Sequence, residues 1–195
     1  MGDFILNRFE NVVFEGAQGL MLDQNFKRFR PHITTSNTGI KNVMKILTNL
    51  KFKGKLEIYY ISRCYVTRHG RGMLPTEVNG KPYKNIVDLT NIPNEFQESL
   101  RFGILDIDLL LEGINKDLQD LKFPAKINMV FTCFDQLDDL EVKYDFQRKE
   151  EIVSKKQFLA QISNILKRNI NSLSDIYVAK GAKREKLIKI EENKD

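Results

Sequence analysis

Short runs of β-branched and aromatic residues alternate along this chain with longer stretches in which apolar residues recur every three or four positions. The strand-like runs cover residues 56–61, 64–66, 127–134 and 176–178. The periodic stretches cover residues 36–50, 105–121 and 154–170. A chain that alternates strands with amphipathic helices is typical of an α/β fold, so we predict a mostly parallel sheet with flanking helices.

The ends of these elements carry local signals. Ser36, Asn37 and Thr38 are available as caps for the first helix, and Ser154 for the third. The run Val12–Phe14 predicts a further short strand that enters a glycine-containing loop, and the run at 176–178 predicts a last strand that ends at Gly181.

Length and composition favour one globular domain. The chain has 195 residues, of which 42% are hydrophobic, and only residues 185–195 have the composition of a charged tail. Cys64 and Cys133 lie far apart without the spacing of a zinc site or a disulfide framework, which favours a reducing compartment. No segment has the length of a membrane span or the pattern of a signal peptide, so we expect a cytoplasmic protein with no membrane partner.

The formal charge of +5 favours a partner that carries phosphate. Nucleic acid is an unlikely partner by this criterion, because the chain lacks a basic tract and lacks the alternation of basic and aromatic residues found in single-strand binders.

Four segments at predicted strand ends carry polar residues or glycine, where open α/β sheets bind ligands. They are residues 15–23, 67–77, 135–139 and 180–184. The first is not a Walker loop, because no GK[ST] follows it. The second contains Arg68, His69 and Gly70 and can form a concave anion site. Taken singly, each segment is more often an ordinary polar turn, and no metal spacing or nucleophilic triad accompanies them.

The same segments, in order, resemble the adenylosuccinate synthetase family. FEGAQGLMLD at 14–23 is similar to the family's FEGAQGxxLD, and PHITTSNT at 31–38 to its P-[YF]-V-T-S-S-N-T. TRHGRGMLPTE at 67–77 is similar to TRVGxGPFPTE, and RFGILD at 101–106 to R-x-G-W-[FL]-D. TCFDQLD at 132–138 matches TKLDVLD, and GAKR at 181–184 stands where the family has G-P-x-R.

The resemblance implies a partial P-loop-type fold and a purine nucleotide ligase. Such an enzyme uses GTP with magnesium to phosphorylate the 6-oxygen of IMP before aspartate displaces the phosphate. By this resemblance Gln18 lies near the reacting 6-position as a catalytic residue, and Thr34 binds the phosphate of the purine monophosphate. The remaining assignments are Arg68, His69 and Gly70 beside the same nucleotide, Arg101 at aspartate, and Asp135 and Gly181 at the base of the triphosphate.

The departures from the family pattern are equally informative. The family's GDEGKG phosphate loop with its catalytic Asp, and its catalytic His, do not occur in this chain. In the aspartate loop, residues 94–101 read NEFQESLR, so only Arg101 matches. The stretch is similar to a viral branch of the family that acts on dGMP and takes ATP, so IMP or dGMP as acceptor and GTP or ATP as donor stay open.

Without a charge clamp and a base, phosphoryl transfer lacks its main catalytic parts, so we expect the chain alone to be inactive. It is either one half of a split ligase, completed by a separate N-terminal chain, or a truncated nucleotide-binding or regulatory protein. A nucleic-acid-binding module is the remaining alternative. A sheet that lacks neighbours also predicts a homo-oligomer or such a partner chain.

Overall fold

The computed structural model describes residues 8–88, 91, 99–181 and 183–190, and it divides the chain into two compact units. Unit 1 comprises residues 1–56 and 113–125, and unit 2 comprises residues 57–112 and 126–195. The expectation of a single domain stays a prediction. Within the described residues, no helix has both the length and the apolar character needed to cross a membrane.

Unit 1 is built around the helix α2, Lys41–Asn49, and the second half of α3, Ile107–Leu118. Two short 3-10 turns precede α2, η1 at Leu20–Leu22 and η2 at Lys27–Phe29. The predicted amphipathic pattern of α2 is confirmed, because Met44 and Leu47 are each 1% exposed.

The predicted caps of α2 are wrong. The helix begins at Lys41, with Ile40 as its N-cap residue and no side-chain cap bond from that residue. The Ile40 N–H instead donates to the two Asp117 carboxylate oxygens at 3.0 and 3.3 Å. A Cβ at Gly39 would lie 1.8 Å from one of these oxygens, so only glycine admits this contact. A carboxylate distant in sequence therefore replaces the local Ser and Thr caps.

The strand predicted at Val12–Phe14 is also wrong, because these residues form no strand. Val12, Val13 and Phe14 are 38%, 87% and 42% exposed. β-Branched residues favour a pleated conformation only where a neighbouring strand supplies hydrogen bonds and packing, and no described strand pairs with this run.

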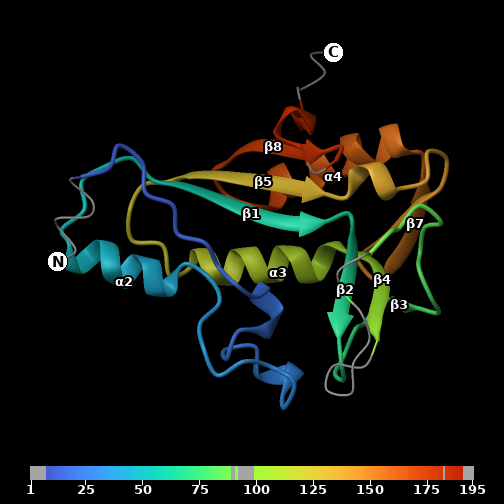
Figure 1. Cartoon of the computed structure of the whole chain (residues 1–195), viewed down its shortest axis with the longest axis horizontal. Coiled ribbons are helices and arrows are strands. Elements are labelled where there is room, and N and C mark those ends of the chain that lie inside the picture. Colours follow the sequence, from blue (N-terminus) through green and yellow to red (C-terminus); the bar gives the residue numbers. More distant parts are fainter. Residues whose placement is uncertain (1–7, 89–90, 92–98, 182, 191–195) are drawn as a thin grey trace. The chain divides into compact units, whose positions relative to one another are not determined.

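The main sheet of unit 2 has the order β1-β5-β8-β9. Its strands are β1 (Glu57–Arg63), β5 (Lys126–Thr132), β8 (Leu173–Ala179) and β9 (Leu187–Lys189). β1, β5 and β8 are parallel, as predicted, and lie side by side in Figure 1. The strand β9 is antiparallel to β8 and was not expected, because it falls within the predicted charged tail at 185–195. Residues 191–195 of that tail lie outside the described residues.

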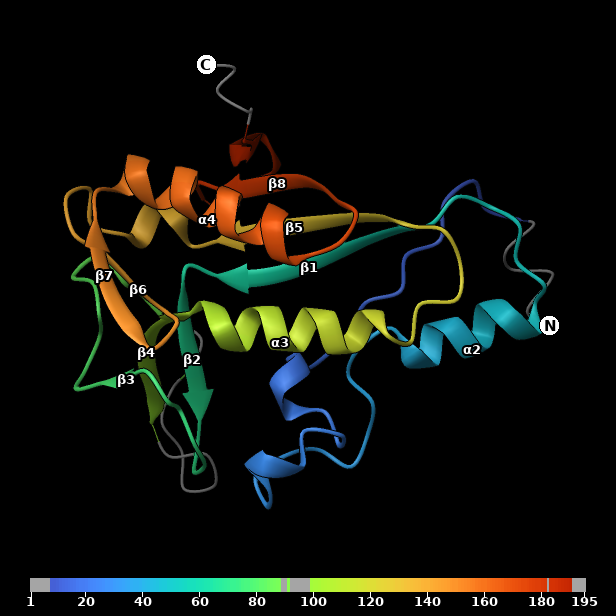
Figure 2. The same cartoon turned by 180° about the vertical axis from the view of Figure 1, so that it is seen from behind.

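The helix α4, Lys155–Asn169, covers one face of this sheet (Figure 2). Its start confirms the prediction, because Ser154 and Gln157 form a capping box in which each side chain bonds the other residue's main-chain N–H. Phe158 is fully buried, and its ring lies 6.4 Å from that of Phe131 on β5. These contacts form the core between helix and sheet.

The second sheet of unit 2 is mixed and mainly antiparallel, in the order β2-β4-β6-β7 with β3 beside β4. Its strands are β2 (Tyr65–His69), β3 (Glu77–Val78), β4 (Leu100–Asp106), β6 (Val142–Phe146) and β7 (Lys149–Val153). Of the predicted run at 64–66, Tyr65 and Val66 lie in β2, whereas β3, β4, β6 and β7 were missed. The helix expected at 105–121 begins only at Ile107, because its first residues end β4. The α/β class is confirmed, with parallel pairing concentrated in the main sheet.

Candidate functional site

The two glycine- and threonine-containing loops of unit 1 are joined by hydrogen bonds. The Thr34 N–H donates to Leu22 O at 2.8 Å, and the Gln24 N–H donates to Ser36 O at 3.1 Å. Segments 14–23 and 31–38 therefore form one loop pair. The family resemblance assigns a residue of each segment to the same monophosphate, so we expect the two segments to lie together.

Asp23 fastens this loop pair. The residue is 8% exposed, and its carboxylate accepts bonds from the Thr38 N–H at 2.7 Å and from the Asn25 N–H at 2.8 Å. The Asn25 side-chain amide donates to the same carboxylate at 2.8 Å. A buried carboxylate that receives this many bonds holds its surroundings in place. Asp23 is the last residue of the FEGAQGLMLD motif, and no role was predicted for it.

Gln18 and Thr34 lie on this loop pair. Gln18 is exposed and makes no hydrogen bond with any residue that the structure describes. Thr34 is partly exposed, and its hydroxyl lies 3.1 Å from that of Ser36. An open amide and a pair of hydroxyls can supply the donors and acceptors that a purine and a phosphate require.

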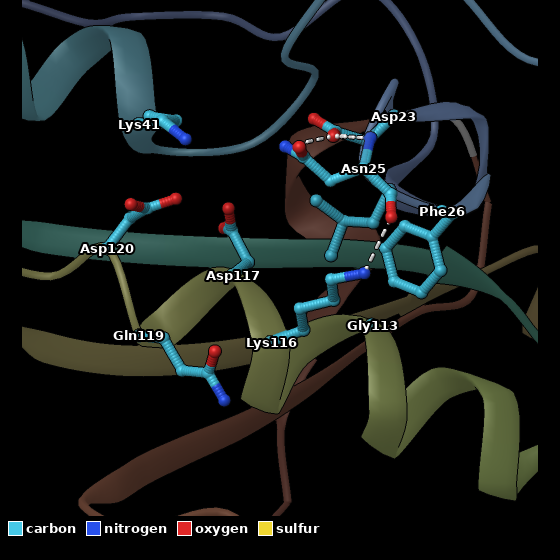
Figure 3. A pocket seen from close by; sticks show the side chains of 10 residues that line it. Asp23, Asn25, Phe26, Lys41, Gly113, Lys116, Asp117, Gln119 and Asp120 are labelled. Carbon is cyan, nitrogen blue, oxygen red and sulfur yellow. Dashed lines mark hydrogen bonds between the residues drawn. The ribbon is translucent and has the colours of Figure 1, made fainter.

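A pocket of about 280 Å³ lies beside the loop pair within unit 1 (Figure 3). Lys116 lines this pocket. Its Nζ donates to Asn25 O at 2.9 Å and lies 4.0 Å from the centre of the Phe26 ring. Gln18 and Thr34 do not line it, so the pocket is distinct from the predicted nucleotide residues. Its lining residues are Leu20, Asp23, Asn25, Phe26, Lys41, Gly113, Lys116, Asp117, Gln119 and Asp120.

In unit 2 the basic loop at 67–77 is closed by Arg101. This residue lies opposite Arg68 in the β2–β4 ladder. Its guanidinium donates to Gly70 O at 2.9 Å and to Gly72 O at 2.8 Å, and it pairs with both carboxylate oxygens of Glu77. Arg101 therefore ties the two glycines and the end of the loop to one strand.

The charges of this loop influence one another. The hydrogen bond from Arg101 holds the pKa of Glu77 below its usual value. Burial, and then the nearby Arg101 charge, lower the pKa of Arg68, whose Nε donates to Arg71 O at 3.1 Å. Glu77 therefore balances one of the two facing arginines, and Arg68 contributes positive charge to the loop.

His69, at the start of the same loop, contacts Asn91, which in turn contacts Asp88. Its Nε2 lies 2.5 Å from the Asn91 side-chain oxygen, and the Asn91 main-chain N–H donates to Asp88 at 3.1 Å. Residues 94–98 of the predicted aspartate loop at 94–101 lie outside the described residues, and Arg101, the residue assigned to aspartate, is described.

Asp135 and Gly181 follow the carboxyl ends of neighbouring parallel strands. Cys133 ends β5 with a left-handed backbone and leads into η3, Phe134–Gln136, on which Asp135 is exposed. Gly181 follows β8, whose Val178 is in register with Phe131 of β5. Both residues therefore lie at the carboxyl-terminal end of the main sheet, where open α/β sheets are expected to bind ligands.

A carboxylate group also forms where β4 meets α3. Asp106, Asp108 and Asp145 each place an oxygen within 4.8 Å of the other two. Asp106 accepts from the Leu109 N–H at 2.9 Å, and Asp108 accepts from the Gln147 N–H at 2.7 Å. Burial, and then the Asp108 charge, raise the pKa of Asp145. No sequence spacing signals this group, because Asp145 comes from a different strand.

Comparison with known proteins decides the family. The family model described as adenylosuccinate synthetase matches residues 4–171, which is most of the chain. The chain belongs to the adenylosuccinate synthetase family. The motifs that identified the family lie on the loop pair, on the Arg101-bound loop and at the carboxyl-terminal end of the main sheet.

Curated adenylosuccinate synthetases give the same result. The protein of Thermoplasma volcanium is 32% identical over 154 residues, which cover 73% of this chain and 35% of the relative. That of Thermoplasma acidophilum is 31% identical over 59% of this chain and 26% of the relative. That of Francisella tularensis subsp. novicida is 39% identical over 35% of this chain and 16% of the relative. The chain thus matches about a third or less of these adenylosuccinate synthetases.

Proposed function

We propose that this chain forms the nucleotide-binding part of an adenylosuccinate synthetase-type ligase, which joins aspartate to the 6-position of a purine monophosphate. The observation that carries the proposal is the bonded loop pair at 14–23 and 31–38. Two segments of the family pattern that are separated in sequence adopt one rigid arrangement, fastened by Asp23. Family membership makes a purine ligase function the natural interpretation of that arrangement.

The monophosphate is proposed to bind through Gln18 and Thr34. Gln18 is open to a ligand and is assigned to the 6-position, and the Thr34 hydroxyl is assigned to the phosphate. The charge distribution supports an anionic ligand here, because unit 1 has eleven basic and six acidic residues, whereas unit 2 has twenty of each. By the family resemblance alone, Arg68, His69 and Gly70 of unit 2 are also proposed as purine monophosphate-binding residues.

The base of the triphosphate is proposed to bind at Asp135 and Gly181. An exposed carboxylate can accept two N–H bonds from a guanine edge, and a neighbouring glycine leaves room for a flat ring. This chemistry favours GTP over ATP.

Arg101 is proposed by resemblance to act at aspartate. Its observed contacts support an indirect role, in which Arg101 does not itself bind aspartate, because its guanidinium is already bound to Glu77 and to two carbonyl oxygens. In this arrangement Arg101 positions the loop that carries Arg68, and a substrate carboxylate has to compete with Glu77 for it.

Magnesium is implied by the family, but the residues at the predicted nucleotide positions do not fit a protein-held magnesium site. Magnesium in nucleotide sites is usually held by one or two carboxylates together with phosphates, whereas Asp135, the single carboxylate among them, is assigned to the base of the triphosphate and so is not left to hold the ion. The carboxylate group at Asp106 is engaged with main-chain N–H groups. We derive no step through magnesium for this chain.

Calorimetry with the purified chain tests the proposal. We expect saturable binding of IMP or dGMP, lost in Thr34→Val and kept in the matched control Thr48→Val, whose hydroxyl bonds only its own helix at Met44 O. Binding of GTP and of ATP, measured in the same way, tests the proposed triphosphate site at Asp135 and Gly181. Absence of binding to all four nucleotides would contradict the proposal.

Catalysis is proposed to need a phosphate loop and a base from outside these 195 residues. An activity assay with the chain alone and with added family proteins tests this point. Product formation by the chain alone would show that it needs no such supplement.

A further inference from the structure

Cys64 and Cys133 are the two cysteines of the chain, and the structure holds both as free thiols. Their distance in the sequence gives no sign of a disulfide. Each nevertheless follows directly on a strand of the main sheet, Cys64 on β1 and Cys133 on β5. These strands are parallel neighbours (Figure 1), so both cysteines lie at the carboxyl-terminal end of the same strand pair.

The hydrogen bonds of this strand pair set the two cysteines opposite each other. Arg63 and Thr132 end the paired register, and the Cys64 N–H donates to Thr132 O at 3.1 Å. This bond continues the parallel ladder by one step, to Cys64 and Cys133. Neighbouring strands lie about 4.8 Å apart, which falls within the Cα separation of about 4.4–6.8 Å that a disulfide spans. The backbone therefore allows a bond between these two positions.

The side chains of the two cysteines also interact. Burial, and then the Cys133 charge, raise the pKa of the Cys64 thiol, as expected for thiols that lie near each other. Burial, the Cys133 charge and a hydrogen bond with Cys133 raise the pKa of Tyr65, the residue after Cys64. The Cys133 side chain is therefore directed toward the segment that holds Cys64.

We propose that Cys64 and Cys133 form a reversible disulfide when the chain is exposed to a peroxide. The Cys133 thiolate attacks one oxygen of hydrogen peroxide, which forms a sulfenic acid and releases hydroxide. The Cys64 sulfur then attacks the Cys133 sulfur, the S–O bond breaks, and the proton of Cys64 leaves with the hydroxide as water. In total, two thiols are oxidised to one disulfide and the peroxide is reduced to two molecules of water.

The order of these two steps follows from burial. Cys133 is partly exposed, whereas Cys64 is 0% exposed. The thiolate is the reactive form of cysteine, and burial in apolar surroundings disfavours it at Cys64. Cys133 therefore meets the oxidant first, and Cys64 serves as the resolving thiol.

The bond fixes the turn that carries Asp135. Cys133 is the N-cap residue of η3, on which Asp135 lies, and it stands where the family motif TKLD has its lysine. The far end of this turn is already held by Lys155, whose Nζ donates to Leu137 O at 3.2 Å. A bond to Cys64 ties the near end to the start of β2. Oxidation thus closes the turn at both ends.

Peptide mapping of the oxidised full chain tests the proposal. We expect hydrogen peroxide to remove both alkylatable thiols, to give a monomer in which residues 64 and 133 are linked, and dithiothreitol to restore both thiols. Two alkylatable thiols after treatment overturn the proposal. A sulfinic acid on Cys133 as the end product, or a bond between two chains, also overturns it.

Thermal unfolding tests whether the bond fits the native fold. The linked chain should unfold about 5 °C or more above the reduced chain, because the bond closes a long loop of the unfolded chain. Hydrogen exchange at residues 134–136 should slow about tenfold or more. A linked chain that unfolds at or below the temperature of the reduced chain overturns the proposal, since the bond would then strain the native strands.

Cys133→Ser is the matched control, because it keeps the size of a partly exposed side chain and removes one sulfur. Peroxide should leave its unfolding temperature and its exchange at 134–136 unchanged, and circular dichroism verifies that it is folded. Cys64→Ala is the second control and should behave in the same way. These readouts need no nucleotide, so their failure leaves the proposed ligand sites unaffected.

Discussion

Arg101 and Glu77 form a two-point ion pair that closes the basic loop of unit 2. The guanidinium Nε donates to Glu77 Oε1 at 2.7 Å, and a second nitrogen contacts Oε2. The same guanidinium binds the carbonyl oxygens of Gly70 and Gly72. One arginine thus connects both ends of a loop that the family pattern assigns to nucleotide binding.

Arg101→Lys is expected to loosen this loop while the strands stay intact. A lysine ammonium cannot bind Glu77 and two carbonyl oxygens in the same fork geometry. Hydrogen exchange at residues 70–72 should accelerate about tenfold or more, with little change in β5. The control Lys149→Arg alters an exposed ion pair on β7 and should leave the loop unchanged. Equal exchange in both variants would contradict the role assigned to Arg101.

Gly103→Ala is expected to destabilise the fold by about 1–3 kcal/mol. A Cβ at this position would lie 2.6 Å from Thr76 O, so the strand β4 or the chain before β3 must move. Urea unfolding measures the change. Gly19→Ala is the matched control, because an added Cβ there meets nothing within 4 Å, and it should change stability by less than about 0.5 kcal/mol.

Asp117→Asn is expected to weaken the start of α2 by about 1 kcal/mol, in the range of a lost helix cap. The variant keeps the size of the side chain but removes the charge that the first N–H groups of the helix favour. Thermal unfolding measures the loss. Asp120→Asn, another carboxylate lining the same pocket, serves as the control. An equal loss in both variants would mean that general charge, and not the cap, is responsible.

Asp175 predicts a dependence of stability on pH. Its hydrogen bonds with Lys126 and then Lys189 lower its pKa from 3.8 to about 2. Because the folded-state pKa lies below the unfolded value, the stabilisation is complete well above pH 4 and is lost as the pH falls through about 2. Asp175→Asn should therefore cost about 1 kcal/mol at pH 7 and progressively less below pH 4. A difference that stays constant from pH 7 to pH 2 would contradict this assignment.

Asp135→Asn is expected to alter the choice of purine triphosphate. An amide offers one acceptor oxygen where the carboxylate offers two, so a guanine edge loses one of its bonds. The ratio of GTP to ATP affinity should fall about tenfold or more in competition binding. Glu141→Gln is the control. Glu141 is an exposed carboxylate a few positions further along the chain, and its substitution should leave the ratio of GTP to ATP affinity unchanged.

Local sequence determined those features whose partners are close along the chain. The start of α4 needs a capping residue directly before the helix, and the strand β5 is a continuous apolar run, so the Ser154 cap and the strand were both predicted, whereas the part of Gln157 in the capping box was not. The family motifs identified the loops in the same way, because each is a short string of residues.

The tertiary structure alone decided the features that join distant residues. The N–H of Ile40 finds its partner at Asp117, 77 positions away, and Arg101 finds Glu77 24 positions away. The strand run at Val12–Phe14 stayed without a neighbour, whereas β6 and β7, with weak patterns, found one in each other. A helix cap or a strand forms only when its hydrogen-bond partner is present, and that partner is set by how the whole chain packs, which local propensity does not specify.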